Sequence, residues 1–491
     1  MIEMRLADVA AVTGGRLHRA SGDERVTAVE FDSRSAGPGT LFLTLPGARV
    51  DGHDFVPAVM AAGATGVLTA RELDAPGVVV PLGARSDDTY LGAADPDGSG
   101  AGVLLALAAL ARHQIANLPG LRTVGITGSA GKTSTKDLVA ALLAPLGPLV
   151  APPGSFNTEL GMPWTALRAD ENTRTLVLEY SARRAGHIAG MARVVAPDVA
   201  VVLNVGSAHL DEFGSVEGIA QAKGELVEAL TADGVAVLNA DDPAVRAMAE
   251  RTKAAVVLVG EAADATIRAE NVRLDGAGRA SYSLVTPTGA APVQLAVAGR
   301  HQVGNTLAAA AVALELGATV TEVAAALADL RLVSTRRMDV FTRADGVTVI
   351  DDSYNANPGS MAAALHALAD MRTTGRRVAV LGYMAELGGY ERAGHEEVGR
   401  LAAQLGVDLL VVVGEPAAPI HDGAVAVPEW GGTSVRVGDQ EEAVALLRGE
   451  LSPGDFALVK GSRYRTWAVV DALRAQRAGV SAPVAEGERT T

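Results

Sequence analysis

The sequence predicts an α/β protein of three domains, on three observations. Its 491 residues exceed what one hydrophobic core usually holds, and this length favours about three domains. Apolar runs alternate with helical patterns along much of the chain, as they do in parallel, doubly wound sheets. Only 3% of the residues are aromatic, which suits helices packed closely on sheets through small side chains. We expect the domains to span residues 1–118, 119–333 and 334–491.

The first domain is predicted from short strands and helices that precede a linker. Strands are expected at 39–45, 66–70 and 78–81. The glycine- and aspartate-rich segment 93–100 predicts a loop, and Asn117-Leu118-Pro119-Gly120 combines the residues of a turn with the position of a domain boundary.

The second domain shows the alternation of strands and helices most clearly. Its expected strands are 175–179, 199–204 and 235–239, and its expected helices are 132–143 and 216–230. This order is typical of a parallel sheet with helices on its faces. Residues 265–297 alternate without a helical pattern and predict a small β region, and the alanine-rich segment 301–316 predicts a long helix.

The third domain repeats the same alternation on a smaller scale and predicts a Rossmann-like fold. Its apolar runs indicate buried strands, at 347–351, 378–381, 409–413 and 457–460. From about residue 477 the chain is polar and rich in alanine, proline, glycine and glutamate, so we expect a mobile tail there.

Charge and composition exclude several classes of protein. The net charge of -15 leaves no general basic surface for nucleic acid, so we expect no nucleic-acid partner. The absence of cysteine excludes disulfides, thiol nucleophiles and cysteine-based zinc sites. The N-terminus lacks the apolar core of a signal peptide, and the apolar run 103–111 ends at Arg112, too short to span a membrane. We therefore expect a cytoplasmic protein without membrane insertion.

A glycine-rich loop between a predicted strand and a predicted helix is the most informative motif. Gly128-Ser129-Ala130-Gly131-Lys132-Thr133-Ser134 places glycines where backbone N–H groups converge on phosphates. Lys132 can neutralise the terminal phosphates, and the hydroxyl of Thr133 can bind magnesium. The spacing is shorter than in the common loop of this kind, because Ile126 stands where that loop has its first glycine. This segment predicts a nucleoside triphosphate site.

Two further side chains are expected near this loop. Glu179 ends the strand 175–179, and His209 follows the strand 199–204. Ligands of open α/β sheets bind at the carboxyl ends of the strands, so both residues could reach a shared metal ion. Each alone also fits an ordinary role, Glu179 as an acid at a strand end and His209 as a solvated loop residue.

An ordered set of segments resembles the Mur ligase family over nearly the whole chain. The resemblance includes the loop at 128–133 and an N-terminal part with Phe31-Asp32-Ser33-Arg34 and Asp51-Gly52-His53. The Tyr354-Asn355-Ala356-Asn357-Pro358 run resembles the branch that joins D-alanyl-D-alanine to a UDP-N-acetylmuramoyl (UDP-MurNAc) tripeptide. The remaining segments are Asn157-Thr158-Glu159-Leu160-Gly161, Asn204-Val205-Gly206-Ser207-Ala208-His209-Leu210, Asn239-Ala240-Asp241-Asp242-Pro243, Gly299-Arg300-His301, Met384-Ala385-Glu386-Leu387-Gly388 and Lys460-Gly461-Ser462-Arg463.

The resemblance implies an ATP-dependent ligase of cytoplasmic peptidoglycan precursor synthesis. A substrate carboxylate attacks the γ-phosphate of ATP to give an acyl phosphate, and an amine then displaces phosphate. Lys132, His209 and Lys223 would be catalytic. Thr133 and Glu179 would hold one Mg²⁺ ion and His209 a second, with Lys223 as a further ligand if CO₂ carbamylates it. From composition alone, Lys223 would be a solvated helix lysine.

The resemblance also distributes the substrates over the chain. The nucleotide would be contacted by Asn305, Arg337 and Asp352. Asn305 is paired with His301 at i, i+4 on one helical face. Ser33 and Arg34 would face the UDP group, and Asn157 and Thr158 the muramoyl sugar or the ATP side. Asn355 and Asn357 would contact the incoming dipeptide. Asn-Ala-Asn-Pro is also good turn chemistry, and His301 equally fits a capping or packing role. We expect small-molecule partners and a monomer.

Three departures from the family pattern keep other functions open. Tyr180-Ser181 replaces a usual Met-Gly pair, Tyr383 a usual Glu, and Gln302 a usual Asn. The first two could reshape the acceptor side, which leaves open a paralogue with an altered acceptor, such as a modified dipeptide or a depsipeptide. A nucleotide-binding protein without catalysis is a second alternative, disfavoured by the complete set of phosphate and metal residues. Diaminopimelate and lysine both remain open as the third residue of the tripeptide.

Overall fold

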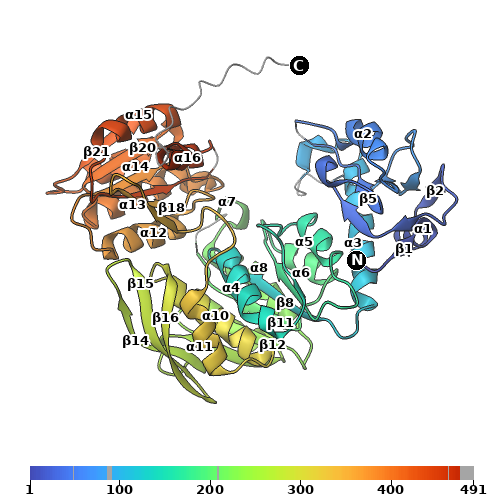
Figure 1. Cartoon of the computed structure of the whole chain (residues 1–491), viewed down its shortest axis with the longest axis horizontal. Coiled ribbons are helices and arrows are strands. Elements are labelled where there is room, and N and C mark those ends of the chain that lie inside the picture. Colours follow the sequence, from blue (N-terminus) through green and yellow to red (C-terminus); the bar gives the residue numbers. More distant parts are fainter. Residues whose placement is uncertain (48, 86–90, 207–209, 463, 476–491) are drawn as a thin grey trace. The chain divides into compact units, whose positions relative to one another are not determined.

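The computed structural model describes residues 1–47, 49–85, 91–206, 210–462 and 464–475. The chain forms two compact units, each with its own sheets and core (Figure 1). The first unit comprises residues 1–204, 220–266 and 308–319, and the second comprises 205–219, 267–307 and 320–491. His209 and the predicted tail from about 477 lie outside the described residues. The domain limits at 118 and 333 stay predictions.

The first unit begins with a small sheet in the order β2-β7-β6-β5-β4. All neighbouring strands are parallel except β2, which is antiparallel to β7. These strands and their helices are β2 (Arg16–His18), β4 (Ala28–Glu30), β5 (Thr40–Leu43), β6 (Gly66–Thr69), β7 (Gly77–Val79), α1 (Leu6–Thr13) and α2 (Val56–Ala61). A separate pair, β1 (Met4–Arg5) and β3 (Arg25–Val26), is antiparallel. Every residue of β5 and β6 is buried, and most are apolar, as is typical of strands covered on both faces.

The long helix α3 (Ser99–Ala116) follows this sheet. Among the described residues it is the one helix whose length and apolar character would suffice to cross a bilayer, and 61% of it is buried inside the protein. It packs against α1 and α5 (Gly161–Ala166). A core helix of a folded domain accounts for these properties.

The rest of the first unit is built on six parallel strands in the order β13-β12-β11-β8-β10-β9. The strands are β8 (Arg122–Thr127), β9 (Leu149–Val150), β10 (Thr175–Glu179), β11 (Val199–Val202), β12 (Val235–Asn239) and β13 (Ala255–Gly260). The helices of this region are α4 (Lys132–Leu143), α5, α6 (His187–Ala192), α8 (Val216–Glu228) and α9 (Pro243–Arg246). Strand order reverses at β8, which has β10 on one side and β11 on the other. Ligands of such sheets bind at this reversal.

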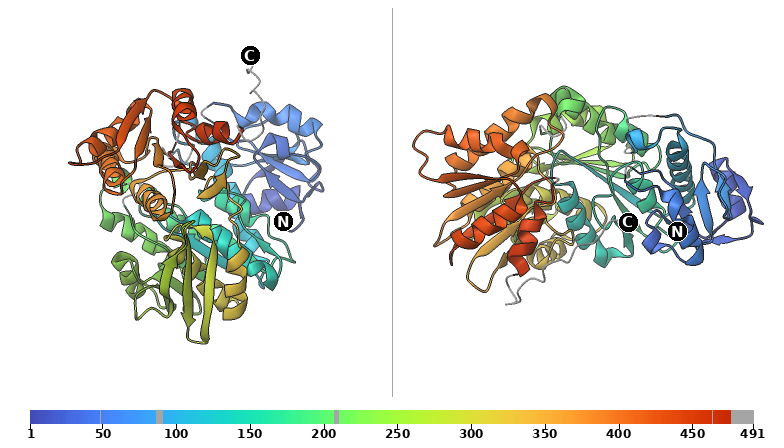
Figure 2. Two further views of the ribbon diagram at one scale, coloured as in Figure 1. Left: turned by 60° about the vertical axis from the view of Figure 1, so that its left-hand side comes forward. Right: turned by 90° about the horizontal axis from the view of Figure 1, so that it is seen from above.

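The second unit contains an antiparallel ribbon and a mixed sheet, seen again in Figure 2. The ribbon consists of β14 (Ile267–Leu274), β15 (Arg279–Thr286) and β16 (Gly289–Ala298), with α11 (Val320–Asp329) packed on β16. The sheet has the order β17-β18-β22-β19-β20-β21, with only β17 antiparallel. Its strands are β17 (Asp339–Thr342), β18 (Thr348–Asp351), β19 (Arg377–Leu381), β20 (Leu409–Val413), β21 (Thr433–Val437) and β22 (Phe456–Lys460).

Helices cover the mixed sheet and complete its core. They are α12 (Pro358–Asp370), α13 (Glu391–Gln404), α14 (Ala418–Val425), α15 (Gln440–Glu450) and α16 (Trp467–Ala475). Two apolar clusters lie on the sheet, one including Ile350, Leu381 and Leu458, the other including Val349, Val380 and Val459. These residues alternate along their strands, which places one cluster on each face.

The predicted elements are present with small shifts of their ends. The strand predicted at 175–179 is β10, and the β region predicted at 265–297 is the ribbon of β14, β15 and β16. The helix predicted at 301–316 is α10 (Gln302–Glu315), which begins one residue later. His301 therefore immediately precedes the first residue of α10.

Candidate active site

The glycine-rich loop joins β8 to α4 at the carboxyl end of the central parallel sheet. Gly131 has φ +83°, a conformation that favours glycine, and α4 starts immediately after it with Lys132. A Cβ atom on Gly128 would lie 2.9 Å from Cβ of Leu203, so the close approach of loop and strand also requires glycine. The Lys132 ammonium donates a hydrogen bond to the Gly128 carbonyl oxygen at 2.6 Å. The loop thus presents a helix N-terminus and one cation, the two features that bind phosphate.

Asn204, two residues after the end of the neighbouring strand β11, fixes the shape of this loop. Its Oδ1 accepts a hydrogen bond from the Ala130 backbone N–H at 2.9 Å, and its Nδ2 donates to the Ala130 carbonyl oxygen at 3.1 Å. The Ser129 backbone N–H also donates to the Asn204 carbonyl oxygen. Both the oxygen and the nitrogen of the Asn204 side-chain amide therefore hold the loop in position.

Oxygen atoms gather around Glu179, the last residue of β10, whose side chain is completely buried. Its Oε2 accepts hydrogen bonds from Thr133 Oγ1 at 3.2 Å and from Asn157 Nδ2 at 3.4 Å. Ser155 Oγ lies 2.9 Å from Thr133 Oγ1 and 3.5 Å from Glu179 Oε2. Thr133 and Glu179, which were predicted to hold one ion together, are thus adjacent, and Asn157 lies beside them. Ser155 is a member that the sequence analysis missed.

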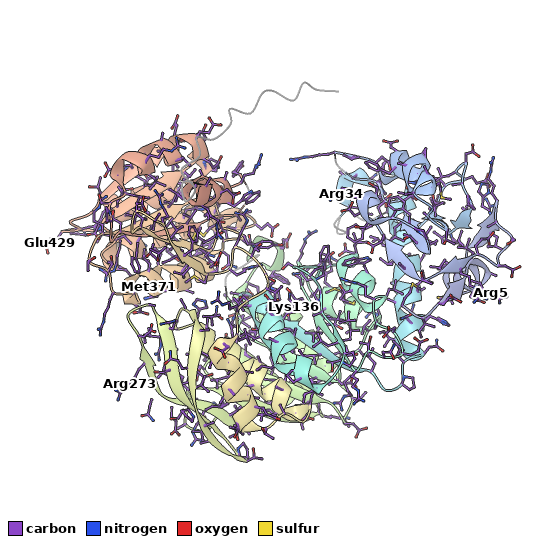
Figure 3. The ribbon with its side chains drawn as sticks, viewed as in Figure 1. Arg5, Arg34, Lys136, Arg273, Met371 and Glu429 are labelled. Carbon is purple, nitrogen blue, oxygen red and sulfur yellow. The ribbon has the colours of Figure 1, made fainter. Side chains whose placement is uncertain are left out.

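The loop that carries Ser155 and Asn157 is anchored by a buried lysine of α4, labelled in Figure 3. Lys136 is 3% exposed, and its Nζ donates a hydrogen bond to the Pro152 carbonyl oxygen at 3.0 Å. It also forms an ion pair with Asp137, which is equally buried, at 2.5 Å. At the other end of the loop, Thr158 accepts a backbone hydrogen bond from Met162 and so stabilises the start of α5. Both anchors hold Ser155 and Asn157 beside Glu179.

Lys223 lies on α8 and is 4% exposed, so it is not the solvated helix lysine that composition alone favours. Burial, with a smaller effect from the charge of Lys132, lowers the pKa of Lys223 to about 7. A large fraction of this amine is therefore neutral near pH 7. Ser134, which follows Thr133 on α4, is also buried.

The second unit carries the other residues implied for the nucleotide. Asn305 Nδ2 donates to Gln302 Oε1 at 2.9 Å, so the two side chains are neighbours on α10. Asp352 forms an ion pair with the buried Lys460 at 2.5 Å, and Lys460 also donates to the Asn355 carbonyl oxygen at 3.0 Å. Burial lowers the pKa values of both Lys460 and His301, and Asp352 opposes this shift in each.

The residues implied for the dipeptide have different surroundings. Asn355 is exposed, whereas Asn357 is the N-cap of α12, where its Oδ1 accepts from the Ser360 backbone N–H at 2.9 Å. The predicted turn chemistry of Asn357 is thus present. The guanidinium of Arg337 lies 4.1 Å from the centre of the Tyr354 ring, a cation–π contact.

A cavity of about 460 Å³ lies in the N-terminal part of the first unit and contains the predicted Ser33 and Arg34. Phe31, Leu45 and Phe55 supply apolar wall. Arg34, labelled in Figure 3, is largely exposed and forms a bidentate ion pair with Asp32. Its hydrogen bonds lower the pKa of Asp32 to about 2. The cavity combines an aromatic wall, a hydroxyl and a guanidinium, which suits a nucleobase linked to phosphates.

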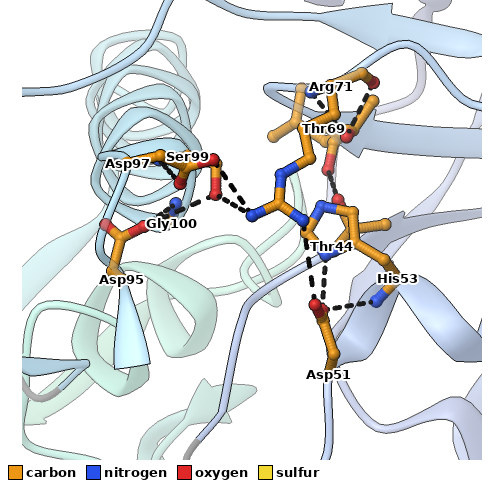
Figure 4. A network of polar contacts seen from close by, with 10 residues as sticks. Thr44, Asp51, His53, Thr69, Arg71, Asp95, Asp97, Ser99 and Gly100 are labelled. Carbon is orange, nitrogen blue, oxygen red and sulfur yellow. Dashed lines mark hydrogen bonds and ion pairs between the residues drawn. The ribbon is translucent and has the colours of Figure 1, made fainter. Parts of the chain in front are cut away.

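The network in Figure 4 holds one wall of this cavity. Asp51, between the lining residues Val50 and Gly52, accepts from His53 Nδ1 at 2.5 Å and lies 3.8 Å from Arg71. Arg71 extends to Asp97 at 3.1 Å and to Ser99 Oγ at 3.2 Å. The network therefore connects the cavity wall to the N-terminus of α3.

We expect Asp95→Ala to destabilise this region by about 1–2 kcal/mol, because the buried Asp95 carboxylate accepts hydrogen bonds from the Gly100 and Ala101 N–H groups. Chemical denaturation of the variant measures this loss. Asp54→Ala, at an exposed position of the same unit, is the comparison. Equal stability of Asp95→Ala and the wild type would contradict the capping role.

Two departures from the family pattern have structural explanations. Tyr180 is completely buried and its hydroxyl donates to the Val195 carbonyl oxygen at 2.6 Å, so the suggestion that it reshapes an acceptor surface was wrong. Tyr383 donates to Glu391 Oε2 at 2.6 Å and stacks on His395. The phenol hydroxyl of Tyr383 is therefore hydrogen-bonded within the second unit.

Comparison with known protein families gives three matches in the order of the chain. Residues 25–114 match the Mur ligase family catalytic domain, 126–313 the Mur ligase middle domain, and 336–463 the Mur ligase glutamate ligase domain. The chain is 52% identical to the UDP-N-acetylmuramoyl-tripeptide--D-alanyl-D-alanine ligase of Mycobacterium tuberculosis, an alignment that covers 96% of this chain and 98% of that protein.

Solved structures agree with these matches. MurF from Acinetobacter baumannii superimposes with a TM-score of 0.83 at 30% identity, covering 96% of this chain and 99% of that one. The MurF ligase from Thermotoga maritima, solved in complex with ADP, gives a TM-score of 0.73 at 29% identity, covering 91% and 97%. The predicted three-domain α/β class is confirmed. The chain belongs to the Mur ligase family.

Proposed function

We propose that this protein is the ATP-dependent ligase that adds D-alanyl-D-alanine to a UDP-MurNAc-tripeptide in cytoplasmic peptidoglycan precursor synthesis. The observation that carries the proposal is the buried oxygen cluster of Glu179, Thr133 and Ser155 beside Lys132, at the reversal of strand order. The similarity to ligases that bear this name, over nearly the full length of both chains, supports the choice of substrates.

The oxygen cluster fits magnesium. Thr133 Oγ1, Ser155 Oγ and Glu179 Oε2 are hard donors, and their separations of 2.9, 3.2 and 3.5 Å suit adjacent ligands of one small ion. In the described part of the chain, no three histidine or acidic side chains lie close enough together to bind a metal ion. The hydroxyls of Thr133 and Ser155 would therefore supply the ligands beside Glu179. Mg²⁺ would neutralise phosphate charge during transfer. We propose that Thr133 and Glu179 hold this ion and His209 a second, with the carbamate of Lys223 as a further ligand.

The residues of the loop act on the phosphates. The N–H groups of Gly131 and Ser134 and the Lys132 ammonium would hold the β- and γ-phosphates, while Asn204 keeps the loop in place. The tripeptide carboxylate attacks the γ-phosphorus and ADP leaves, giving an acyl phosphate. The amine of D-alanyl-D-alanine then attacks the acyl carbon and phosphate departs. Asn305, Arg337 and Asp352 would hold the nucleotide, and Asn355 and Asn357 the dipeptide.

On the tripeptide side, Ser33 and Arg34 would hold the UDP group in the 460 Å³ cavity, and Asn157 and Thr158 the muramoyl sugar. The carboxamide of Asn157 lies beside Glu179. A tripeptide that contacts Asn157 would therefore have its carboxyl end near the phosphate loop. We propose that the protein acts as a monomer.

Lys223 is expected to act as its carbamate. CO₂ reacts only with the neutral amine, and with a pKa of about 7 the neutral fraction of Lys223 rises as the pH increases through 7. At equal concentrations of dissolved CO₂, enzyme depleted of CO₂ should therefore regain activity faster at pH 8 than at pH 6. Carbon-13 NMR with labelled bicarbonate should give a carbamate signal that Lys223→Met removes and Lys253→Met, at an exposed lysine, retains. A signal unaffected by Lys223→Met would refute the assignment.

Phosphate release tests the whole proposal. The purified protein is incubated with ATP, Mg²⁺ and UDP-MurNAc-tripeptide, with D-alanyl-D-alanine, without it, and with other amine- and hydroxyl-terminated acceptors. We expect release that depends on both substrates, and a product whose mass has increased by the dipeptide. Turnover with another acceptor only would identify a paralogue with altered specificity. No phosphate release with any acceptor would indicate a nucleotide-binding protein without catalysis.

A further inference from the structure

A second cavity of about 440 Å³ lies in the first unit, outside the residues assigned above. Its wall is apolar and includes the buried side chains of Leu104, Met162, Pro163 and Met191. Leu104 comes from α3, Met162 and Pro163 from α5, and Met191 from α6. The polar lining side chains include the half-buried Glu159 and the exposed Arg184. The cavity is therefore largely apolar, and Glu159, Arg184 and His187 are its titratable lining side chains.

The cavity adjoins the oxygen cluster along two segments of the chain. Glu159 is two residues from Asn157, and the lining residue Ser181 is two residues from Glu179. Two residues span at most about 7 Å, so the reacting carboxylate and the cavity lie within the length of one long side chain. A substrate residue whose carboxyl group reacts beside Glu179 can place its own side chain in this cavity.

We propose that this cavity binds the side chain of the third residue of the tripeptide and selects diaminopimelate over lysine. This inference rests on the proposed function. The aliphatic stem shared by both residues would contact Leu104, Met162 and Met191. The ammonium at its end would pair with Glu159. Only diaminopimelate adds a carboxylate there, and Arg184 is the matching cation.

The apolar part and the charged part of the cavity make separate contributions. Burial of a methylene stem favours both lysine and diaminopimelate over alanine at the third position. The Arg184 contact favours diaminopimelate alone. Because Arg184 is exposed, we expect its contribution to be about five- to tenfold in KM rather than the larger factor of a buried pair.

The test compares three UDP-MurNAc-tripeptides with diaminopimelate, lysine or alanine as the third residue. For the wild type we expect kcat/KM to fall in that order. Arg184→Gln should raise KM for the diaminopimelate peptide about five- to tenfold and leave the other two unchanged. Arg193→Gln, an exposed arginine outside the cavity lining, is the matched control and should change none of them. Equal shifts for all three peptides, or none, with Arg184→Gln would overturn the proposal.

A second variant tests the apolar part. Ala108 of α3 lines the cavity, and Ala108→Phe should fill it and raise KM for both long side chains while sparing the alanine peptide. An equal effect on the alanine peptide would overturn the proposal. Titration calorimetry of the same peptides without ATP gives the same comparison from binding alone. Binding without ligation would therefore defeat the proposed function, whereas ligation without discrimination would defeat this inference.

Discussion

Lys132→Ala is expected to reduce kcat by at least about 10³-fold, since it removes the one cation of the phosphate loop. The Lys132 ammonium lies 2.6 Å from the Gly128 carbonyl oxygen, so it is already within the loop that would surround the phosphates. Its charge is needed most as the γ-phosphoryl group is transferred, and kcat should therefore fall more than KM for ATP rises. Steady-state phosphate release at saturating substrates measures the effect.

The control for this substitution is Lys253→Ala. Lys253 is an exposed lysine of the same unit, and its loss changes the net charge equally. Thermal unfolding of both variants establishes that they are folded. If Lys132→Ala retains wild-type turnover, the assignment of the loop as the ATP site is incorrect.

Glu179→Gln is expected to lower kcat on the order of 10²-fold or more and to raise the Mg²⁺ concentration needed for half-maximal activity. The substitution keeps the size of the side chain but removes the negative charge from a completely buried position beside Thr133 and Ser155. The amide can still pair with its hydroxyl neighbours, so we expect the fold to persist. A Mg²⁺ titration of phosphate release separates the two effects.

Glu250→Gln, at an exposed position in the same unit, serves as the matched control and should show the wild-type Mg²⁺ dependence. Ser155→Ala should give a smaller shift in the same direction, because a neutral hydroxyl binds magnesium more weakly than a carboxylate. An unchanged Mg²⁺ requirement in Glu179→Gln would show that the ion binds elsewhere.

The fold could be predicted from the sequence because buried parallel strands leave continuous apolar runs. The runs that became β10, β11 and β12 lie between helical patterns, and their order identifies a parallel sheet before any contact is known. Glu179 could be placed for the same reason, since it ends such a run and the carboxyl ends of parallel strands meet at one edge of the sheet.

Other features depend on contacts between residues distant in the sequence. Ser155 lies in an irregular loop, and anchors such as the hydrogen bond from Lys136 to Pro152 hold it beside Glu179. Tyr180 follows the strand end directly, yet its ring turns into the core, where its hydroxyl meets Val195. His301 could not be excluded from α10 by periodicity, because a shift of one residue at a helix end leaves the apolar pattern unchanged.

Asn204 limits which amino acids this position can tolerate. Its side chain presents one acceptor and one donor to a single residue, Ala130, as a neighbouring peptide group would. Aspartate would keep the acceptor but replace the donor with a second acceptor facing a carbonyl oxygen, and it would add a negative charge where phosphates bind. Leucine would lose both bonds, and glutamine would be too long by one methylene group. Among the genetically encoded side chains, this position therefore accepts asparagine and little else.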